Sequence, residues 1–220
     1  MLALREALAV NKNNKVYDLV VERLLSAQYA FGDRLLVKEL AADTGASRQP
    51  IMAALNRLSA DGFVRIIPQV GCEVIDPSRD EIADFFVMFQ RMEGLLAELA
   101  ARRRTDEQLR DLERVQRQIR ANQQTGDAHE YALLNRAFHH TMHLMAHSPL
   151  LSEKQRSNFN MSDFFITHSV GFNAFMSEAA REHEDIIDAI TRQQPERARL
   201  LGEAHFAAIA SAVLSGMDDR

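Results

Sequence analysis

The histidines of this 220-residue sequence all lie in its second half, where their spacing could assemble a metal site. Asn135 and His139 are one helical turn apart, so both side chains would leave the same face of one helix. His183 and His205 flank the turn at Gln193-Gln194-Pro195 at nearly equal distances. In an antiparallel helix pair, both would lie about 16 Å from that turn at a rise of about 1.5 Å per residue. Three imidazoles suit Zn, Ni or a similar divalent ion and leave a position for a further ligand, so Asn135, His139, His183 and His205 are predicted metal ligands.

Histidine is also a common core or surface residue, so the spacing alone leaves that ordinary role open. His140, His143 and His147 are interpreted as a polar flank beside the bundle cavity rather than as a second cluster. His129 and His168 have no partner at a regular spacing, and we expect both in solvent.

A second group of residues, between Val37 and Ile75, has the side chains that nucleic acids require. Arg48 can bond a guanine bidentately or bind a phosphate, and Lys38 and Gln49 would supplement it. Ser47 would contact the DNA backbone. The predicted DNA-contacting residues are Lys38, Ser47, Arg48, Gln49, Met52, Gln69 and Gly71.

Two helices and a hairpin would position these side chains. A first helix is predicted from Lys38 to Asp43, Gly45 supplies a left-handed turn, and Ser47 would cap the second helix through its hydroxyl. The core face of the second helix is predicted at Ile51, Ala54, Leu55 and Leu58. Strands are predicted at Phe63–Ile67 and Cys72–Ile75. This order is typical of a winged helix-turn-helix, whose second helix can enter the major groove.

The rest of the chain indicates helices. A short amphipathic helix is predicted at Met1–Val10 and a further one at Lys15–Ala27, while Tyr29–Leu35 is predicted to be a loop. After residue 76, capping boxes at Ser78–Glu81 and Thr105–Gln108 open two of six predicted helices. The fold class is therefore mainly α, with an N-terminal winged helix-turn-helix domain at residues 1–76 and an all-α helical-bundle effector domain at residues 77–220.

Composition limits the class of protein. The length allows two modest domains, and a single cysteine excludes an internal disulfide and suits a reducing compartment. The opening residues do not form a signal peptide, and no stretch reaches the roughly 20 apolar residues that cross a bilayer. We therefore expect a cytoplasmic protein with no membrane partner. The net charge is −5, and residues 1–76 carry nine basic and nine acidic side chains, so a homodimer would be needed to double the basic patch.

Tyr17 to Ile75 resembles the DNA-binding domain of GntR-type bacterial transcriptional regulators. The resemblance rests on Gly32-Asp33-Arg34-Leu35, Leu40-Ala41, Ser47-Arg48-Gln49-Pro50, Leu58, Gly62 and Gly71. That family usually has an arginine at the place of Met52 and another in the wing, where Gln69 and Val70 stand here. The differences imply an operator unlike the family's common half-site, or low affinity per monomer.

Asp80 to about Leu214 resembles the helical effector domain of the FadR-type subgroup. Phe138-His139, Glu182-His183 and His205 match its motifs. The resemblance implies a divalent metal held by an Asp and three His that helps to bind a carboxylate effector. Asn135 stands at the Asp position, and Phe89 stands where the subgroup commonly has an arginine one turn before the glutamate, here Glu93.

These observations predict a homodimeric transcriptional repressor that reads a near-palindromic double-stranded operator and is released by a small carboxylate effector bound at the metal site. No organic cofactor and no enzymatic activity are expected. Two alternatives stay open. In a metal sensor the ion itself would be the signal, whereas in a metal-dependent enzyme His139, His183 and His205 would activate water. The enzyme lacks a clearly placed carboxylate base.

Overall fold

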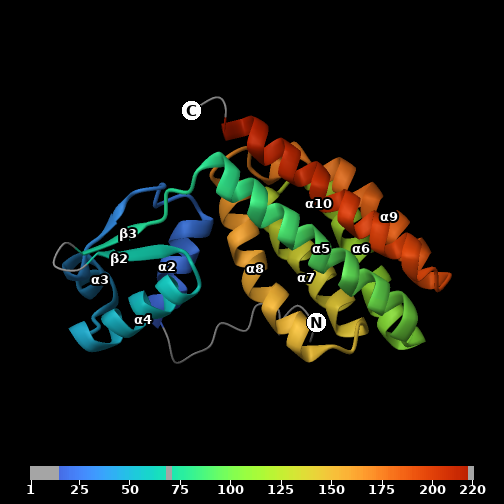
Figure 1. Ribbon diagram of the computed structural model, residues 1–220, viewed down its shortest axis with the longest axis horizontal. Coiled ribbons are helices and arrows are strands. Elements are labelled where there is room, and N and C mark those ends of the chain that lie inside the picture. Colours follow the sequence, from blue (N-terminus) through green and yellow to red (C-terminus); the bar gives the residue numbers. More distant parts are fainter. Residues whose placement is uncertain (1–14, 68–70, 218–220) are drawn as a thin grey trace. The chain divides into compact units, whose positions relative to one another are not determined.

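The structure is a computed structural model that describes residues 15–67 and 71–217. The predicted helix at Met1–Val10 and the wing residues Gln69 and Val70 lie outside the described residues. The chain forms two compact units (Figure 1). One contains residues 15–78 and Asn160–His168, and the other contains Arg79–Phe159 and the chain from Ser169 onward.

Three helices form the core of the first unit. Helix α2 spans Lys15–Leu25, α3 spans Val37–Thr44 and α4 spans Arg48–Ala60. The turn between α3 and α4 depends on Gly45, whose φ of 67° is left-handed and whose amide donates to the carbonyl of Ala41. The predicted core face of α4 is confirmed, because Ile51, Ala54, Leu55 and Leu58 are all buried.

The predicted capping role of Ser47 is wrong in its detail. Ser47 precedes α4 in an extended conformation, as a capping residue should, but its hydroxyl makes no capping hydrogen bond. Ser47 is exposed, so water can satisfy the first-turn amides that the side chain leaves free.

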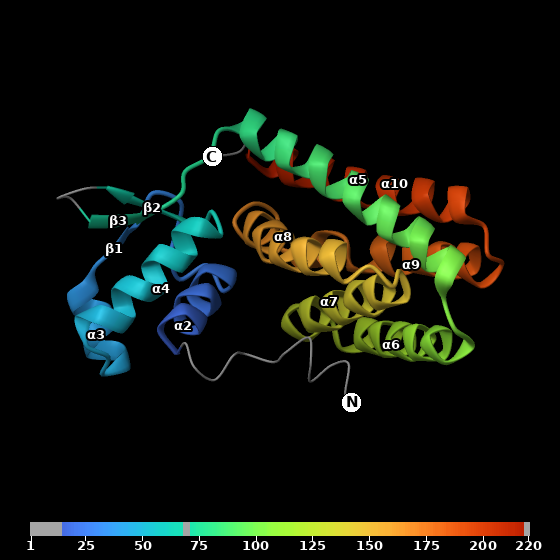
Figure 2. The ribbon, with the colours of Figure 1, turned by 60° about the horizontal axis from the view of Figure 1, so that its bottom comes forward.

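The small sheet has one strand more than the sequence predicted. Strands β2 (Val64–Ile67) and β3 (Gly71–Val74) form the expected antiparallel hairpin, with Val64 opposite Val74. Strand β1 (Arg34–Leu35) pairs antiparallel with β3 on its other side, so the predicted loop at Tyr29–Leu35 ends in a strand. A strand of two residues is too short to show an alternating pattern, and its partners Glu73 and Cys72 are distant from it in sequence. Figure 2 shows the strands along one side of the three helices.

The second unit is built from the helices predicted after residue 76. They are α5 (Arg79–Arg103), α6 (Asp106–Thr125), α7 (Ala128–Met145), α8 (Pro149–Thr167), α9 (Met176–Thr191) and α10 (Pro195–Met217). A short 3-10 helix that was not predicted, η1 (Phe172–Ala174), precedes α9. The capping box at Thr105 and Gln108 is confirmed, with both reciprocal bonds present. Helix α10 is long and apolar enough to cross a membrane, but it carries the buried His205 and packs along α5, as a core helix does.

Helix α8 contributes to both units. Its first part, to Phe159, belongs to the bundle, and Asn160–His168 belongs to the winged unit. There Phe164 is fully buried against the rings of Phe31 and Phe63. The prediction that His168 lies in solvent is wrong, because this half-buried ring bonds the carbonyls of Phe164 and Tyr29 at 2.8 and 2.7 Å.

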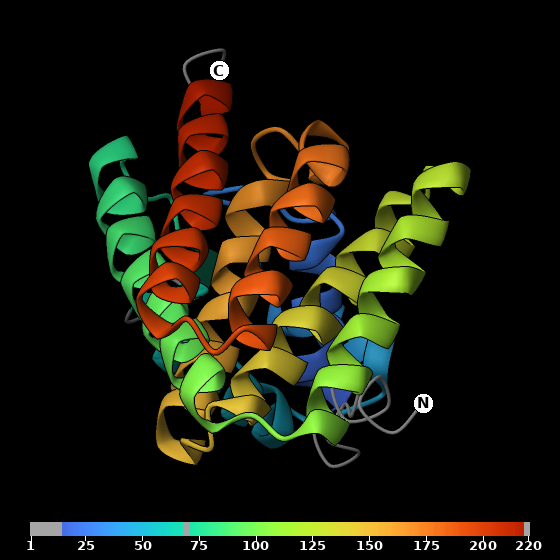
Figure 3. The same ribbon diagram turned by 90° about the vertical axis from the view of Figure 1, so that its right-hand side faces the viewer.

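Helices α5 and α10 lie side by side (Figure 3) and approach each other closely at two glycines. A Cβ on Gly202 would lie 3.3 Å from Cα of Gly94. A Cβ on Gly94 would lie 2.9 Å from the carbonyl oxygen of Arg199 and 2.5 Å from Cγ of Glu203. Because a backbone atom cannot move aside cheaply, this crossing requires glycine.

We therefore expect Gly94→Ala to destabilise the protein by about 1–3 kcal/mol, the usual cost of overpacking. The measurement is urea unfolding followed by circular dichroism. Ser211→Ala, on the exposed face of α10, is the control and should change stability little. A Gly94→Ala protein as stable as the unmodified chain would contradict the close crossing.

Candidate metal centre and DNA-facing surface

Three histidines from three helices meet in the core of the bundle. His139 comes from α7, His183 from α9 and His205 from α10, and each is at most 1% exposed. Their ring centroids lie 4.9 to 5.4 Å apart, and one nitrogen of each lies within 4.8 Å of the others. The expectation that His183 and His205 lie at the same height in the α9–α10 hairpin is confirmed.

Four ring nitrogens of these three histidines have no hydrogen-bond partner among the described residues. These are Nε2 of His139, Nε2 of His205 and both nitrogens of His183. Buried polar atoms are rarely left unsatisfied, and each such atom needs an explanation. Three convergent imidazole lone pairs are what a Zn or Ni ion requires, so the residues present fit a metal.

Two of the three imidazole rings are hydrogen-bonded to carboxylates. Nδ1 of His139 donates to Oε2 of Glu93 at 3.0 Å, and Nδ1 of His205 donates to Oε2 of Glu182 at 2.6 Å. A proton on Nδ1 leaves the lone pair on Nε2, which is the form that binds a metal. His183 is positioned differently, because its ring stacks on Phe138 with centroids 3.9 Å apart.

Burial keeps two of the histidines neutral. It is the main cause that lowers the pKa of His139 to about 4, although the bond to Glu93 acts in the opposite direction. Burial likewise lowers the pKa of His183 well below its ordinary value, and the neighbouring imidazoles of His205 and His139 add to the effect. Both rings are therefore uncharged near pH 7, as metal ligands must be.

Asn135 lies on α7 one turn before His139, as predicted. Its side chain is 6% exposed, and its amide oxygen has no hydrogen-bond partner within the described part of the chain. A neutral amide oxygen is a weaker ligand for Zn or Ni than a charged carboxylate.

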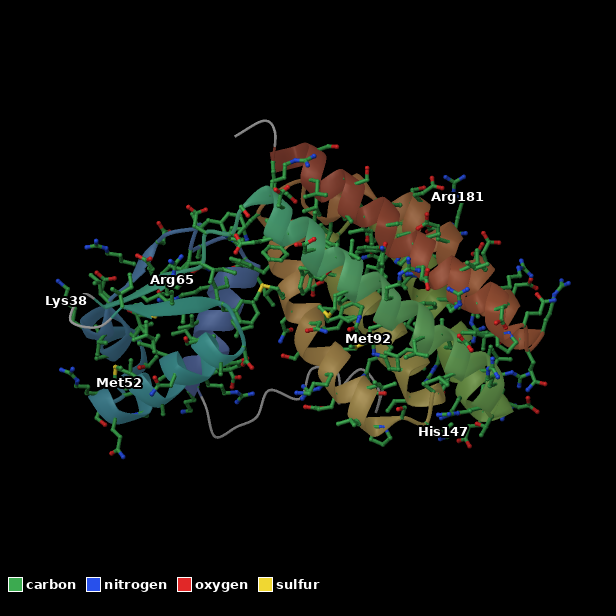
Figure 4. The ribbon with its side chains drawn as sticks, viewed as in Figure 1. Lys38, Met52, Arg65, Met92, His147 and Arg181 are labelled. Carbon is green, nitrogen blue, oxygen red and sulfur yellow. The ribbon has the colours of Figure 1, made fainter. Side chains whose placement is uncertain are left out.

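The interpretation of His143 as a polar flank is wrong. His143 is buried, and its Nε2 bonds Oε1 of Glu93 at 2.7 Å. His147 (labelled in Figure 4), in contrast, is exposed. It follows the end of α7 with a φ of 47°, so it no longer shares the helical face of His139.

Two functional candidates, Glu93 on α5 and Gln155 on α8, were not predicted from the sequence. Both are fully buried, and Nε2 of Gln155 donates to Oε1 of Glu93 at 2.8 Å. Burial raises the pKa of Glu93, but the imidazoles of His143 and His139 outweigh that effect and lower it, so the carboxyl group is ionised. A carboxylate within the apolar run Met92–Leu96 was a signal that could have identified Glu93.

The predicted DNA-contacting residues lie on the winged unit. Lys38 on α3 and Ser47, Arg48 and Gln49 at the start of α4 are exposed, Met52 is half-buried, and Gly71 is exposed at the start of β3. Figure 4 shows Lys38 pointing away from α3 at the outer edge of this unit. Gln69 lies in the part of the wing that the structure does not describe.

Two other basic side chains of this unit are already engaged. Arg57 lies over the ring of Tyr17 at 4.0 Å, and Arg65 pairs with Glu73 across β2 and β3 at 4.0 Å. Arg48, at the exposed start of α4, has no such ring or ion-pair contact among the described residues. It is therefore the side chain at the start of this helix best placed to reach DNA.

Comparisons with known proteins match both halves of the chain. The model of bacterial regulatory proteins of the gntR family matches residues 12–74, and the model of the FCD domain matches residues 84–208. A regulator in an unstable DNA locus of Streptomyces ambofaciens is 27% identical, covering 88% of this chain and 81% of its own. The gluconate operon transcriptional repressor of Bacillus licheniformis is 26% identical, covering 76% and 67%. The solved structure of E. coli McbR/YncC has the same fold, with a TM-score of 0.77 at 18% identity, over 91% of this chain and 96% of that one.

Proposed function

Because the chain belongs to the gntR family of bacterial regulatory proteins and carries an FCD domain, we propose that it is a repressor released by a small carboxylate. Its general role follows from the family: it is a DNA-binding transcriptional regulator rather than an enzyme. The finer proposal is that a cytoplasmic homodimer reads a near-palindromic operator, since a two-fold symmetric protein requires two related half-sites.

The observation that carries the proposal is the convergence of His139, His183 and His205 in the buried core of the bundle, with ring nitrogens that have no hydrogen-bond partner among the described residues. These residues, with Asn135 as a weaker fourth ligand, would hold a Zn or Ni ion. The ion would supply a positive charge to which an effector carboxylate can bind. Such a charge is needed because Phe89, not a basic residue, lies one turn before Glu93 on α5.

The DNA side of the proposal rests on the exposed start of α4. Arg48 would contact a guanine or a phosphate there, supported by Lys38, Ser47 and Gln49, while Met52, Gln69 and Gly71 would lie beside the DNA. Repression is supported by the gluconate operon repressor of Bacillus licheniformis, to which the chain is similar over most of its length. Release works if the effector binds the DNA-free arrangement of the dimer more tightly than the DNA-bound one.

The test is an effector titration of the metal-loaded homodimer on an operator selected from random duplexes. A panel of sugar acids, hydroxy acids and dicarboxylates is added while operator affinity is followed by fluorescence anisotropy. We expect at least one carboxylate to lower operator affinity by about 5–150-fold, the usual range of allosteric coupling. The chelator-treated protein should not respond. A panel without any effect on the metal-loaded protein would contradict the proposal.

The metal-sensor alternative makes a different prediction in the same assay. Operator affinity would then follow the free Zn or Ni concentration in the absence of any organic ligand. The enzyme alternative is excluded by the family. The two carboxylates bonded to the histidines, Glu93 and Glu182, orient imidazole rings and are not placed as free general bases.

A further inference from the structure

Glu93 has an unusual position for a carboxylate. It lies in the middle of α5, with 0% of its surface exposed, and the buried side chains one turn away on that helix, Phe89, Leu96 and Ala97, are apolar. A buried charge is costly unless it is paired and fully hydrogen-bonded. An apolar side chain would pack there at less cost, so the carboxylate needs a role that packing does not supply.

Three donors from two other helices define the orientation of the carboxylate. Oε2 accepts from Nδ1 of His139 at 3.0 Å, and Oε1 accepts from Nε2 of His143 at 2.7 Å and from Nε2 of Gln155 at 2.8 Å. The two oxygens therefore accept from different donors, and a quarter-turn of the carboxylate would weaken all three bonds.

Gln155 is itself fixed in place. Its amide nitrogen also donates to the carbonyl of Phe89 at 3.3 Å, and its amide oxygen accepts from Nδ2 of Asn158 at 3.1 Å. Phe89, one turn before Glu93, packs its ring against Phe159 and Phe206 and offers no charge.

The fixed orientation of Glu93 determines the tautomer of His139. A ring that donates from Nδ1 to a fixed carboxylate is the tautomer whose Nε2 carries a lone pair, and this Nε2 is the His139 nitrogen that has no hydrogen-bond partner among the described residues. It is therefore the nitrogen available to bind a metal together with His183 and His205. We propose that Glu93 is a positioning residue for the metal centre, held by a His143–Gln155 clamp that fixes the tautomer and the ring orientation of His139. The inference rests on the proposed metal site.

Glu93→Gln is the first variant to test, because an amide keeps the size of the side chain but has a single accepting oxygen, so it cannot accept from His139 and from the pair His143 and Gln155 at once. The readout on metal-free protein is the tautomer of His139, measured by long-range ¹H–¹⁵N NMR on histidine-labelled protein. We expect the Nδ1–H form of His139 in the unmodified chain and a loss of that uniform signal in Glu93→Gln. The affinity for Zn or Ni, from competition with a chromogenic chelator, should fall by about 10–100-fold, as for other residues that orient metal ligands.

Gln155→Met serves where Glu93→Gln does not fold, because it removes one donor and leaves the carboxylate. We expect it to weaken metal binding by several fold. Glu153→Gln is the matched control, since it makes the same chemical change on the exposed face of α8 and should alter neither readout.

Three results would overturn the inference: an Nε2–H tautomer of His139 in the unmodified protein, an unchanged tautomer in folded Glu93→Gln, or an unchanged metal affinity in Gln155→Met. If the unmodified chain binds neither Zn nor Ni, the proposed metal site fails. The NMR measurement on metal-free protein then still decides whether Glu93 sets the tautomer of His139.

Discussion

Replacing Arg48 by alanine is expected to lower operator affinity by at least about 30-fold. A bidentate contact to guanine is worth about 1–3 kcal/mol, and a homodimer loses one contact in each half-site. The measurement is anisotropy of a labelled operator at two salt concentrations. Salt separates the two roles of Arg48, because loss of a phosphate contact reduces the salt dependence and loss of a base contact relaxes sequence preference instead.

The control for this variant is Arg181→Ala. Arg181 is also an exposed arginine, but it lies on α9 of the bundle and pairs with Glu178 (Figure 4). It should leave operator binding unchanged. Full operator affinity in the Arg48→Ala protein would remove α4 as the DNA-reading helix.

Replacing His183 by leucine is expected to abolish metal-dependent stabilisation without harming the metal-free protein. Both ring nitrogens of His183 are unpartnered within the described residues, so the change breaks no hydrogen bond and removes two buried polar atoms. The metal-free variant should therefore unfold at the same temperature as the unmodified chain or at a higher one. A metal at 100 times its Kd stabilises a protein by about 2.7 kcal/mol. For a chain of this size that is a rise of about 5–10 °C in Tm, which the variant should lose.

Two further variants, at Asn135 on α7 and at His147 just after its end, make the result specific. His147→Leu removes an exposed histidine just after α7 and should keep the full metal-induced shift. Asn135→Asp should enlarge the shift at a fixed metal concentration, because a carboxylate is a stronger ligand than an amide oxygen. A His183→Leu protein that retains the shift would contradict the three-histidine site.

Local patterns account for most of the fold. The apolar spacing of Ile51, Ala54, Leu55 and Leu58 predicted the buried face of α4, and Gly45 predicted the left-handed turn before it. The capping box at Thr105 and Gln108 predicted the start of α6. Each feature depends on residues within about one or two helical turns, so the sequence carries the information without reference to the rest of the chain.

The sequence also predicted that His183 and His205 lie close together. In an antiparallel helix pair, two residues that are equally many positions from the connecting turn lie at the same level along the pair. Strand β1 was not predicted, since two residues have no period and their partner in β3 is remote. The two cases differ in the sequence separation of the partners. The residues of a hairpin are close in sequence, whereas β1 pairs with residues of β3 that are far from it in sequence.

The sequence by itself determined the order of the helices, the winged helix-turn-helix and the set of histidines that could meet. Only the tertiary structure decided that His143 belongs to the core network while His147 does not, because α7 ends at Met145 and the helical face ends with it. Only the tertiary structure placed Glu93 of α5 in contact with His139, and Gln155 of α8 in contact with Glu93. The packing of helices that are distant in sequence determines which polar side chains are buried together.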